Sequence, residues 1–214
     1  MKPTRLILIR HGEVKGPKPG AFHSQQDVPL SLEGQQKMAE IARALKVLNL
    51  PCVASSDLSR TTYGADLAAG DGTYRLIDRD FREIDFGAWS GLTWEEIEEL
   101  WPGAMKQRLQ DPTGYRPPGG ESLLDLKERV VVALERLLAG YPGKTVALFA
   151  HGGVNRVILA EALGLPLENI FRIQQDYACI NLIDYFPDGP SLIRIINAPH
   201  DIDLKKILLR HDWP

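Results

Sequence analysis

Short apolar runs alternate along the chain with longer segments in which apolar residues recur at helical spacing. The runs at 6–9, 52–54 and 145–150 are bounded by polar residues, as is typical of strands buried on both faces of a parallel sheet. Helical spacing marks 31–45, where Ser31 can cap the first turn, as well as 121–138 and 155–163. Strands that alternate with helices predict an α/β fold, a three-layer sandwich in which helices flank a mainly parallel sheet.

Two further segments complete this outline. The stretches 178–185 and 191–196 flank the turn sequence Pro187-Asp188-Gly189-Pro190, which predicts that the sheet closes with a hairpin. The segment 86–118 is irregular and rich in Gly, Pro and Trp, with one short helix predicted over 93–100 and Thr93 as its cap. We therefore expect a single domain over 1–214 with a lid-like insertion at about 86–118.

The overall charge limits the classes of partner. The net charge of the 214-residue chain is -3, which gives no general attraction to nucleic acid or to acidic membranes. An anionic substrate must therefore be attracted by a local cluster of positive charge. No apolar stretch approaches the roughly 20 residues that a membrane span needs. We expect neither nucleic acid nor membrane as a partner, and the oligomeric state stays open, a dimer included.

The cysteines and the N-terminal segment bear on the compartment. Cys52 and Cys179 stand in apolar surroundings without metal-type spacing, which favours buried free thiols over a disulfide. The apolar run before Arg10 is too short for a signal peptide. These features predict a cytoplasmic protein.

Residues with phosphate chemistry follow three of the predicted strands. Arg10 and His11 follow the first, Arg60 follows the second within Ser55-Ser56-Asp57-Leu58-Ser59-Arg60, and His151 follows the run at 145–150. Ligands of open α/β sheets bind at the carboxyl ends of strands, so these side chains should meet. Arginine can hold phosphate oxygens with its planar fork, one imidazole can attack phosphorus, and the other can bind an equatorial oxygen. The helix after His151 should point its N-terminal amides at the same phosphate.

An in-line transfer also needs an acid for the leaving oxygen, and Glu83, at the start of the lid segment, is the best candidate. Each element alone has a structural interpretation: an Arg-His pair at a strand end, a loop histidine or a solvated carboxylate. Their occurrence together in one chain favours the functional interpretation.

The chain also resembles the histidine phosphatase superfamily, the phosphoglycerate mutase-like family, over nearly its whole length. Six motifs in family order carry the resemblance: 8–13, 27–34, 56–60, 82–91, 118–122 and 150–153. The resemblance implies that His11 is the phosphorylated nucleophile and that Arg10, Arg60 and His151 hold the phosphate. It also implies that Glu83 is the proton donor, with His11 and His151 as its catalytic partners. The resemblance implies no metal, we expect no cofactor for this chain, and the implied substrate is a small anionic phosphoester.

The chain departs from the family at the loop after the nucleophile. Many members carry an asparagine in the phosphate pocket where this chain has Pro17, and a common glycine is replaced by Ser24. His23, Ser24 and Gln25 are candidates for the missing substrate contacts, and a surface loop is the alternative.

The substrate is less clearly specified. Arg-His-Gly-Glu-Val at 10–14, Asp-Val-Pro-Leu-Ser at 27–31 and the segment 171–181 are most similar to the α-ribazole phosphatases of cobalamin biosynthesis, which favours α-ribazole 5'-phosphate or a related phosphoester. Lid aromatics can stack on its flat base or pack the lid onto the body: Trp89, Trp94, Trp101 and Tyr115. The alternatives are a broad-specificity or sugar-phosphate phosphatase and a cofactor-dependent phosphoglycerate mutase, which needs a longer segment after the proton donor. A non-catalytic phosphate-binding protein is disfavoured because His11, His151 and Glu83 are all retained.

Overall fold

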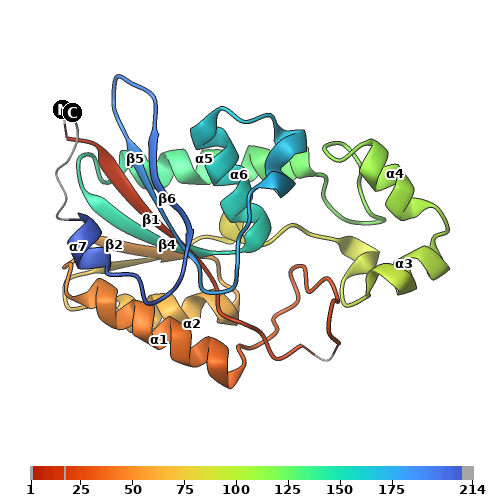
Figure 1. The fold of residues 1–214 in the computed structure, drawn as a ribbon, viewed down its shortest axis with the longest axis horizontal. Coiled ribbons are helices and arrows are strands. Elements are labelled where there is room, and N and C mark those ends of the chain that lie inside the picture. Colours follow the sequence, from red (N-terminus) through yellow and green to blue (C-terminus); the bar gives the residue numbers. More distant parts are fainter. Residues whose placement is uncertain (1, 17, 209–214) are drawn as a thin grey trace.

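The computed structural model describes residues 2–16 and 18–208, in which six strands form one sheet in the order β3-β2-β4-β1-β5-β6 (Figure 1). β1 pairs in parallel with β4, and β2 pairs in parallel with both β4 and β3. β5 pairs antiparallel with β1 on one side and with β6 on the other. The strands are β1 Thr4–Arg10, β2 Cys52–Ser55, β3 Tyr74–Ile77, β4 Thr145–Ala150, β5 Ile180–Tyr185 and β6 Leu192–Ala198. The predicted mainly parallel sheet with a closing hairpin is confirmed.

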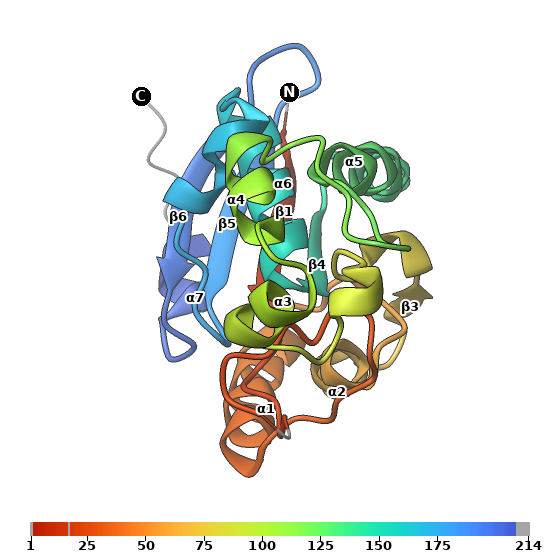
Figure 2. The same ribbon diagram turned by 90° about the vertical axis from the view of Figure 1, so that its right-hand side faces the viewer.

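Helices cover both faces of the sheet (Figures 1 and 2). α1 (Leu32–Lys46) and α2 (Ser59–Ala68) pack on the face to which Ile7 and Ile9 of β1 point. α5 (Leu123–Ala139) and α6 (Gly152–Leu163) pack on the opposite face, with Leu6 and Leu8. Because neighbouring side chains of a strand point to opposite faces, the apolar run of β1 supplies both cores. The three-layer α/β sandwich predicted from the sequence is thus confirmed.

Several elements differ from the sequence-based outline. The structure adds α2, β3 and the short helix α7 (Leu204–Leu208), and it begins α6 three residues earlier than predicted, at Gly152. The lid segment contains two helices where one was expected, α3 (Trp94–Leu100) and α4 (Ala104–Gln110). Thr93 caps α3 as predicted, in a capping box with Glu96. Short 3₁₀ turns occupy Arg79–Phe81, Gly87–Trp89 and Leu167–Arg172.

The lid helices extend away from the sandwich, and the two ends of the segment meet at its base (Figure 1). There the amide of Glu121 donates to the carbonyl of Asp85 (2.7 Å), and the amide of Ala88 donates to the carbonyl of Pro118 (2.9 Å). Gly87 has φ +51°, and a Cβ at this position would lie 2.3 Å from the Pro118 carbonyl oxygen. A glycine is therefore required where the two chain segments cross.

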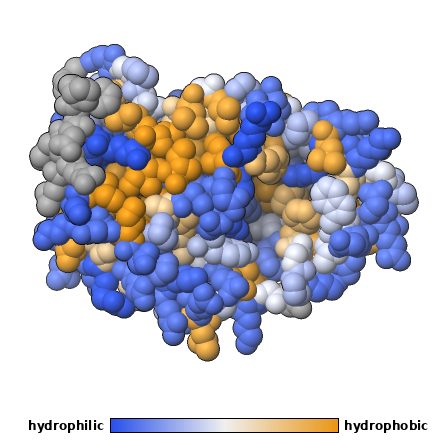
Figure 3. Space-filling model, viewed as in Figure 1, coloured by the Kyte–Doolittle hydropathy of each residue, from blue (hydrophilic) through white to orange (hydrophobic). Residues whose placement is uncertain are grey.

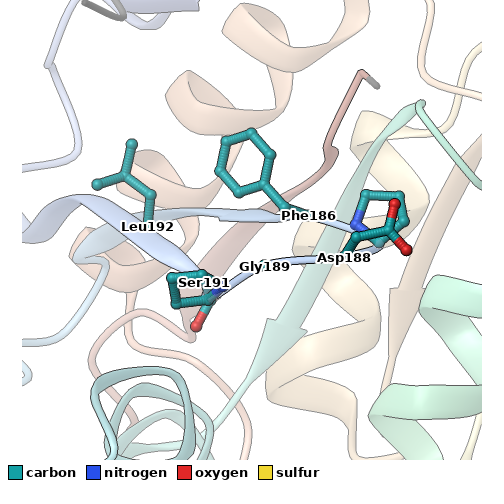
Figure 4. A pocket seen from close by; sticks show the side chains of 7 residues that line it. Phe186, Asp188, Gly189, Ser191 and Leu192 are labelled. Atoms are coloured by element: carbon teal, nitrogen blue, oxygen red, sulfur yellow. The ribbon is translucent and has the colours of Figure 1, made fainter.

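The end of the sheet away from the predicted site carries an apolar surface. Hydrophobic residues gather over β5 and β6 in Figure 3, and a hollow of about 420 Å³ lies at their turn, lined by 186–192 (Figure 4). Thr4 pairs with Tyr185, so this hollow lies where β1 begins, whereas the predicted site follows its last residue. Among the described helices, none is both long and apolar enough to span a membrane.

Candidate active site

The carboxyl ends of β1, β2 and β4 meet at one edge of the sheet because these strands are parallel neighbours. Arg10 ends β1 and His11 follows it, Arg60 lies in the first turn of α2, and His151 joins β4 to α6. The ring centroids of His11 and His151 are 5.2 Å apart. The structure therefore brings together the four residues that the sequence singled out.

A cavity of about 160 Å³ opens at this cluster. Arg10, His11, Arg60 and Glu83 all line it, which places the expected acid beside the expected nucleophile. His151 is fully buried and reaches the site through its contacts with His11 and Arg60. The rest of the lining is mainly apolar or aromatic: Val14, Ala21, Phe22, His23, Ser24, Phe86 and Tyr177.

His11 is held in one tautomer by the main chain. Its Nδ1 lies 2.7 Å from the carbonyl oxygen of Gly12, so Nδ1 must donate, and Nε2 carries the lone pair. Burial of the ring, together with the charges of Arg60 and Arg10, holds the pKa of His11 well below its ordinary value. A Cβ on Gly12 would lie 2.5 Å from the Gly34 carbonyl oxygen, so the loop that follows His11 packs directly on the first turn of α1. The result is a neutral, fixed imidazole with a free nucleophilic nitrogen.

His151 sits between Arg60 and Ser56. Its Nδ1 accepts from Nε of Arg60 (3.3 Å), and its Nε2 therefore donates to the hydroxyl of Ser56 (2.9 Å). That hydroxyl also lies 2.7 Å from the Thr61 hydroxyl. Burial lowers the pKa of His151 well below its ordinary value, and the charges of Arg60, His11 and Arg10 act in the same direction. His151 is thus held in one orientation, and its surroundings favour the neutral ring.

The two arginines are held by main-chain carbonyls rather than by carboxylates. Arg60, only 1% exposed, donates to the carbonyls of Gln26 (2.6 Å) and Ser24 (2.7 Å). Arg10 donates to the carbonyl of Gln175, and its guanidinium lies 4.1 Å from the centre of the Tyr177 ring. Nε of Arg10 is buried with no partner in the described part of the chain. Both arginines therefore bring uncompensated positive charge to the cavity, as a site for a phosphate dianion requires.

Glu83 is fixed at the N-terminus of α6. Both its carboxylate oxygens lie 3.1 Å from the amide nitrogen of Gly153, and Oε1 also accepts from the amide of Ile84 (3.0 Å). A Cβ at position 153 would lie 2.4 Å from Oε1, so this approach depends on Gly153. The amides at the start of the helix after His151 were expected to face the phosphate, but the Gly153 amide in the first turn of α6 donates to Glu83 instead.

Arg129 of α5 encloses the main chain around Glu83, a contact that the sequence analysis missed. Its guanidinium forms a bidentate ion pair with Glu121, with distances of 2.8 Å. It also donates to three carbonyls of the segment before the lid, those of Asp80 (2.6 Å), Arg82 (2.9 Å) and Glu83 (3.0 Å). Glu121 belongs to the motif at 118–122, which was the one available signal.

The three weaker candidates have different surroundings. The Ser24 hydroxyl accepts from the Phe86 amide (2.8 Å) and donates to the Ile84 carbonyl (3.2 Å), and the Gln25 amide donates to the Glu83 carbonyl (3.1 Å). Their side chains thus brace the Glu83 loop. His23 lines the cavity, and burial lowers its pKa. Pro17, where the family asparagine is missing, lies outside the described residues.

The aromatic residues at the cavity are not those expected from the lid. Trp89 is buried and stacks on Tyr115 with 5.5 Å between ring centroids, whereas Trp94 is 44% exposed. Trp101 packs against the core. The cavity is instead lined by Phe22, Phe86 and Tyr177, and the Tyr177 ring lies 5.6 Å from that of His11. Tyr177 lies in the closing segment 171–181, but its role depends on a contact 166 positions away in sequence, which no local pattern indicates.

Several proteins are similar to this chain in sequence, and several solved structures are similar to it in fold. A bifunctional protein of Mycobacterium tuberculosis is 33% identical over 91% of this chain, which spans about half of that relative's length (54%). The glucosyl-3-phosphoglycerate phosphatase of Mycolicibacterium vanbaalenii is 32% identical over 79% of this chain and 78% of its own length. The structure of α-ribazole phosphatase from Shigella flexneri superposes with a TM-score of 0.82 over 91% of this chain and 96% of its own, and its 23% identity marks a shared fold.

The sequence profile of the histidine phosphatase superfamily (branch 1) matches residues 6–198. This range runs from β1 to β6 and includes every residue of the cluster described above. The chain therefore belongs to the histidine phosphatase superfamily.

Proposed function

We propose that this protein is a metal-independent phosphomonoesterase that forms a phosphohistidine at His11. The observation that carries the proposal is the position of the His11 ring, which has an unprotonated Nε2 and lines a cavity together with Arg10, Arg60 and Glu83. A nucleophile, two unpaired cations and a carboxyl group are the parts that phosphoryl transfer needs.

The proposed reaction has two steps. In the first, Nε2 of His11 bonds to phosphorus while the bond to the leaving oxygen breaks, and Glu83 gives that oxygen its proton. In the second, Glu83 takes a proton from water, the water oxygen bonds to phosphorus, and the bond to His11 breaks. Arg10, Arg60 and His151 hold the equatorial oxygens, where negative charge concentrates in both transition states. For His151 this means that a phosphate oxygen replaces the Ser56 hydroxyl as the acceptor of its Nε2–H.

α-Ribazole 5'-phosphate is the first substrate to test. The motifs at 10–14, 27–31 and 171–181 support it, and Phe22, Phe86 and Tyr177 offer aromatic faces at the cavity to a flat base. A sugar-phosphate or related phosphatase is the second candidate, favoured by the 32% identity with an enzyme named glucosyl-3-phosphoglycerate phosphatase. We also propose a cytoplasmic location, in keeping with the buried free thiols of Cys52 and Cys179.

A panel of phosphoesters tests the function. We expect free phosphate from para-nitrophenyl phosphate and from at least one physiological ester, with α-ribazole 5'-phosphate giving the highest kcat/KM if the first candidate is correct. EDTA should leave the rate unchanged, since no step uses a metal. Exchange of phosphate between phosphoglycerate isomers in the presence of bisphosphoglycerate, without net phosphate release, would identify a mutase instead. Lack of turnover on the whole panel would leave only phosphate binding.

Arg129→Lys should impair proton donation by Glu83 rather than the attack of His11 on phosphorus. Lysine keeps the charge but cannot bond Glu121 and three carbonyls at once. A displacement of about 1 Å at a catalytic group can cost on the order of a hundredfold in rate. We expect such a loss of kcat with alkyl phosphates, which need an acid, and a much smaller one with para-nitrophenyl phosphate.

Arg136→Lys is the matched control, because Arg136 also lies on α5 and pairs with acids, Asp78 and Asp80, but is exposed. It should leave both substrates unaffected. An equal loss on both substrates in Arg129→Lys would mean that Arg129 only stabilises the fold.

A further inference from the structure

Most arginines in the described ranges 2–16 and 18–208 pair with carboxylates, and those that do not form a pattern. The paired ones are Arg5, Arg75, Arg79, Arg82, Arg116, Arg129, Arg136 and Arg194. Arg43 and Arg172 are exposed to solvent, which screens their charge. The remaining four are buried or half-buried: Arg10, Arg60, Arg108 and Arg156. Because an unpaired charge is costly to bury, such arginines point to places where an anion binds.

Two of these four arginines line the cavity of the proposed phosphate site, and a third lies beside them. Arg10 and Arg60 line its cavity. Arg156 approaches Arg10 at the start of α6: its Nη1 and the Arg10 Nε lie 3.2 and 3.3 Å from the point that a Cβ on Gly152 would occupy. Its Nε is held by the Ile173 carbonyl at 2.9 Å. Of the four buried or half-buried arginines without a carboxylate partner, Arg108 alone lies away from the proposed phosphate site, so the phosphate does not account for its charge.

Arg108 projects from the last turn of α4 onto the ring of Phe86, with 4.9 Å between guanidinium carbon and ring centre. It makes neither a hydrogen bond nor an ion pair with any residue that the structure describes, and burial lowers its pKa. Phe86 lines the cavity together with Glu83 and contacts Phe22 at 4.9 Å. Arg108 therefore approaches the cavity from the lid, on the side where Phe86 separates the two.

The position of Glu83 indicates what this side of the cavity receives. The proton donor must face the leaving oxygen, and Phe86 follows Glu83 by three residues in the same wall. The leaving group therefore extends from Glu83 toward Phe86 and the lid, where the unpaired guanidinium lies. A second negative charge on the substrate, beyond its phosphate, would compensate the charge of this arginine, which a neutral leaving group cannot do.

We propose that Arg108 binds a carboxylate on the leaving group, so that the enzyme prefers phosphorylated carboxylic acids to neutral phosphoesters of the same size. This inference rests on the proposed phosphatase function and deepens it. The planar guanidinium can hold both oxygens of a carboxylate, and the Phe86 ring beneath it keeps its plane fixed and water away from one face. A phosphorylated acid would then rank above α-ribazole 5'-phosphate, whose leaving group carries no carboxylate.

A matched pair of substrates tests the proposal. 3-Phosphoglycerate and glycerol 3-phosphate share a three-carbon chain and a terminal phosphate, and they differ by a carboxylate against a hydroxymethyl group. We expect the wild type to have the higher kcat/KM on 3-phosphoglycerate. Arg108→Met, of similar length but uncharged, should lower this value by roughly 10- to 100-fold, the usual cost of a charge-assisted hydrogen bond, and leave glycerol 3-phosphate nearly unchanged.

Arg116→Met is the control, because Arg116 is another lid arginine but is exposed and paired with Asp125. It should keep the wild-type preference. A second measurement needs no variant: 3-phosphoglycerate should inhibit hydrolysis of para-nitrophenyl phosphate by the wild type more strongly than glycerol 3-phosphate does.

Two results would overturn the inference while leaving the proposed function intact. One is equal loss on both substrates in Arg108→Met, which would mean that Arg108 only packs the lid on Phe86. The other is a wild type that hydrolyses para-nitrophenyl phosphate but neither prefers nor is better inhibited by the acid. Absence of phosphate release from para-nitrophenyl phosphate itself would refute the proposed function and the inference with it.

Discussion

Replacing His11 by alanine is expected to abolish turnover of every phosphoester and, with it, the acid-labile phosphoenzyme. The position offers one nucleophilic nitrogen in a fixed direction, since Nδ1 is committed to the Gly12 carbonyl. His151 cannot substitute, because its lone pair is on Nδ1 and accepts from Arg60, so that its Nε2 carries a proton and is not nucleophilic. Loss of a nucleophile in comparable sites costs on the order of a millionfold in kcat. Rapid quenching of enzyme with labelled substrate measures both quantities.

The pH dependence of kcat/KM tests the same residue in the wild type. Burial and the neighbouring arginines lower the pKa of His11, so its folded-state pKa lies below that of a free imidazole. The neutral, reactive form therefore persists as pH falls through the range in which an exposed histidine would become protonated. We expect the acid limb of the profile to lie below the ordinary histidine pKa.

His200→Ala is the control for His11→Ala, because His200 lies at the surface against Glu40. It should retain both turnover and phosphoenzyme. Near wild-type turnover in His11→Ala would refute the phosphohistidine route, and a phosphoenzyme that persisted there would identify another acceptor.

The position of the site at the carboxyl ends of the strands could be predicted, because its residues follow apolar strands in sequence. Arg10, His11 and His151 directly follow runs whose pattern marks them as buried parallel strands, and the geometry of a parallel sheet brings their ends together. The edge strand β3 escaped because Tyr74–Ile77 is partly exposed and carries no apolar run. α6 begins three residues before the predicted start: Gly152 and Gly153 have low helix propensity, yet both belong to its first turn.

The contacts that fix the residues around the cavity could not be predicted from local sequence patterns. Arg129 holds carbonyls 46 to 49 positions earlier in the chain, and Ser24 bonds the main chain of Phe86, 62 positions later. Such contacts follow from how the lid base crosses the loop after β1, which no periodicity encodes. Trp89 and Tyr115 were candidates for stacking on the substrate, because aromatic residues in a lid often contact a ligand. In the structure they stack on each other instead.

Replacing Glu83 by glutamine is expected to separate substrates by their leaving groups. Attack by His11 expels an alkoxide from an alkyl phosphate, and this oxygen must be protonated as its bond to phosphorus breaks. Glutamine has nearly the shape of glutamate and one oxygen that can still accept from the amides of Ile84 and Gly153, but it cannot deliver a proton. General acid catalysis contributes about 10²- to 10⁴-fold, so alkyl phosphates should slow by that factor. Para-nitrophenolate leaves without a proton and should be nearly spared.

Asp85→Asn provides the comparison that decides the assignment. Asp85 is the other carboxylate of the same loop, but its side chain accepts from the Gly87 amide (2.9 Å) at the base of the lid and does not line the cavity. We expect this variant to affect alkyl and nitrophenyl phosphates alike, if it affects either. The ratio of kcat values for the two substrates, measured in both variants, is the readout, because general damage to the fold lowers both rates and cancels in the ratio. A ratio that changed in Asp85→Asn and not in Glu83→Gln would transfer the role of proton donor to Asp85, and Glu83 would then serve only to fix the loop to α6.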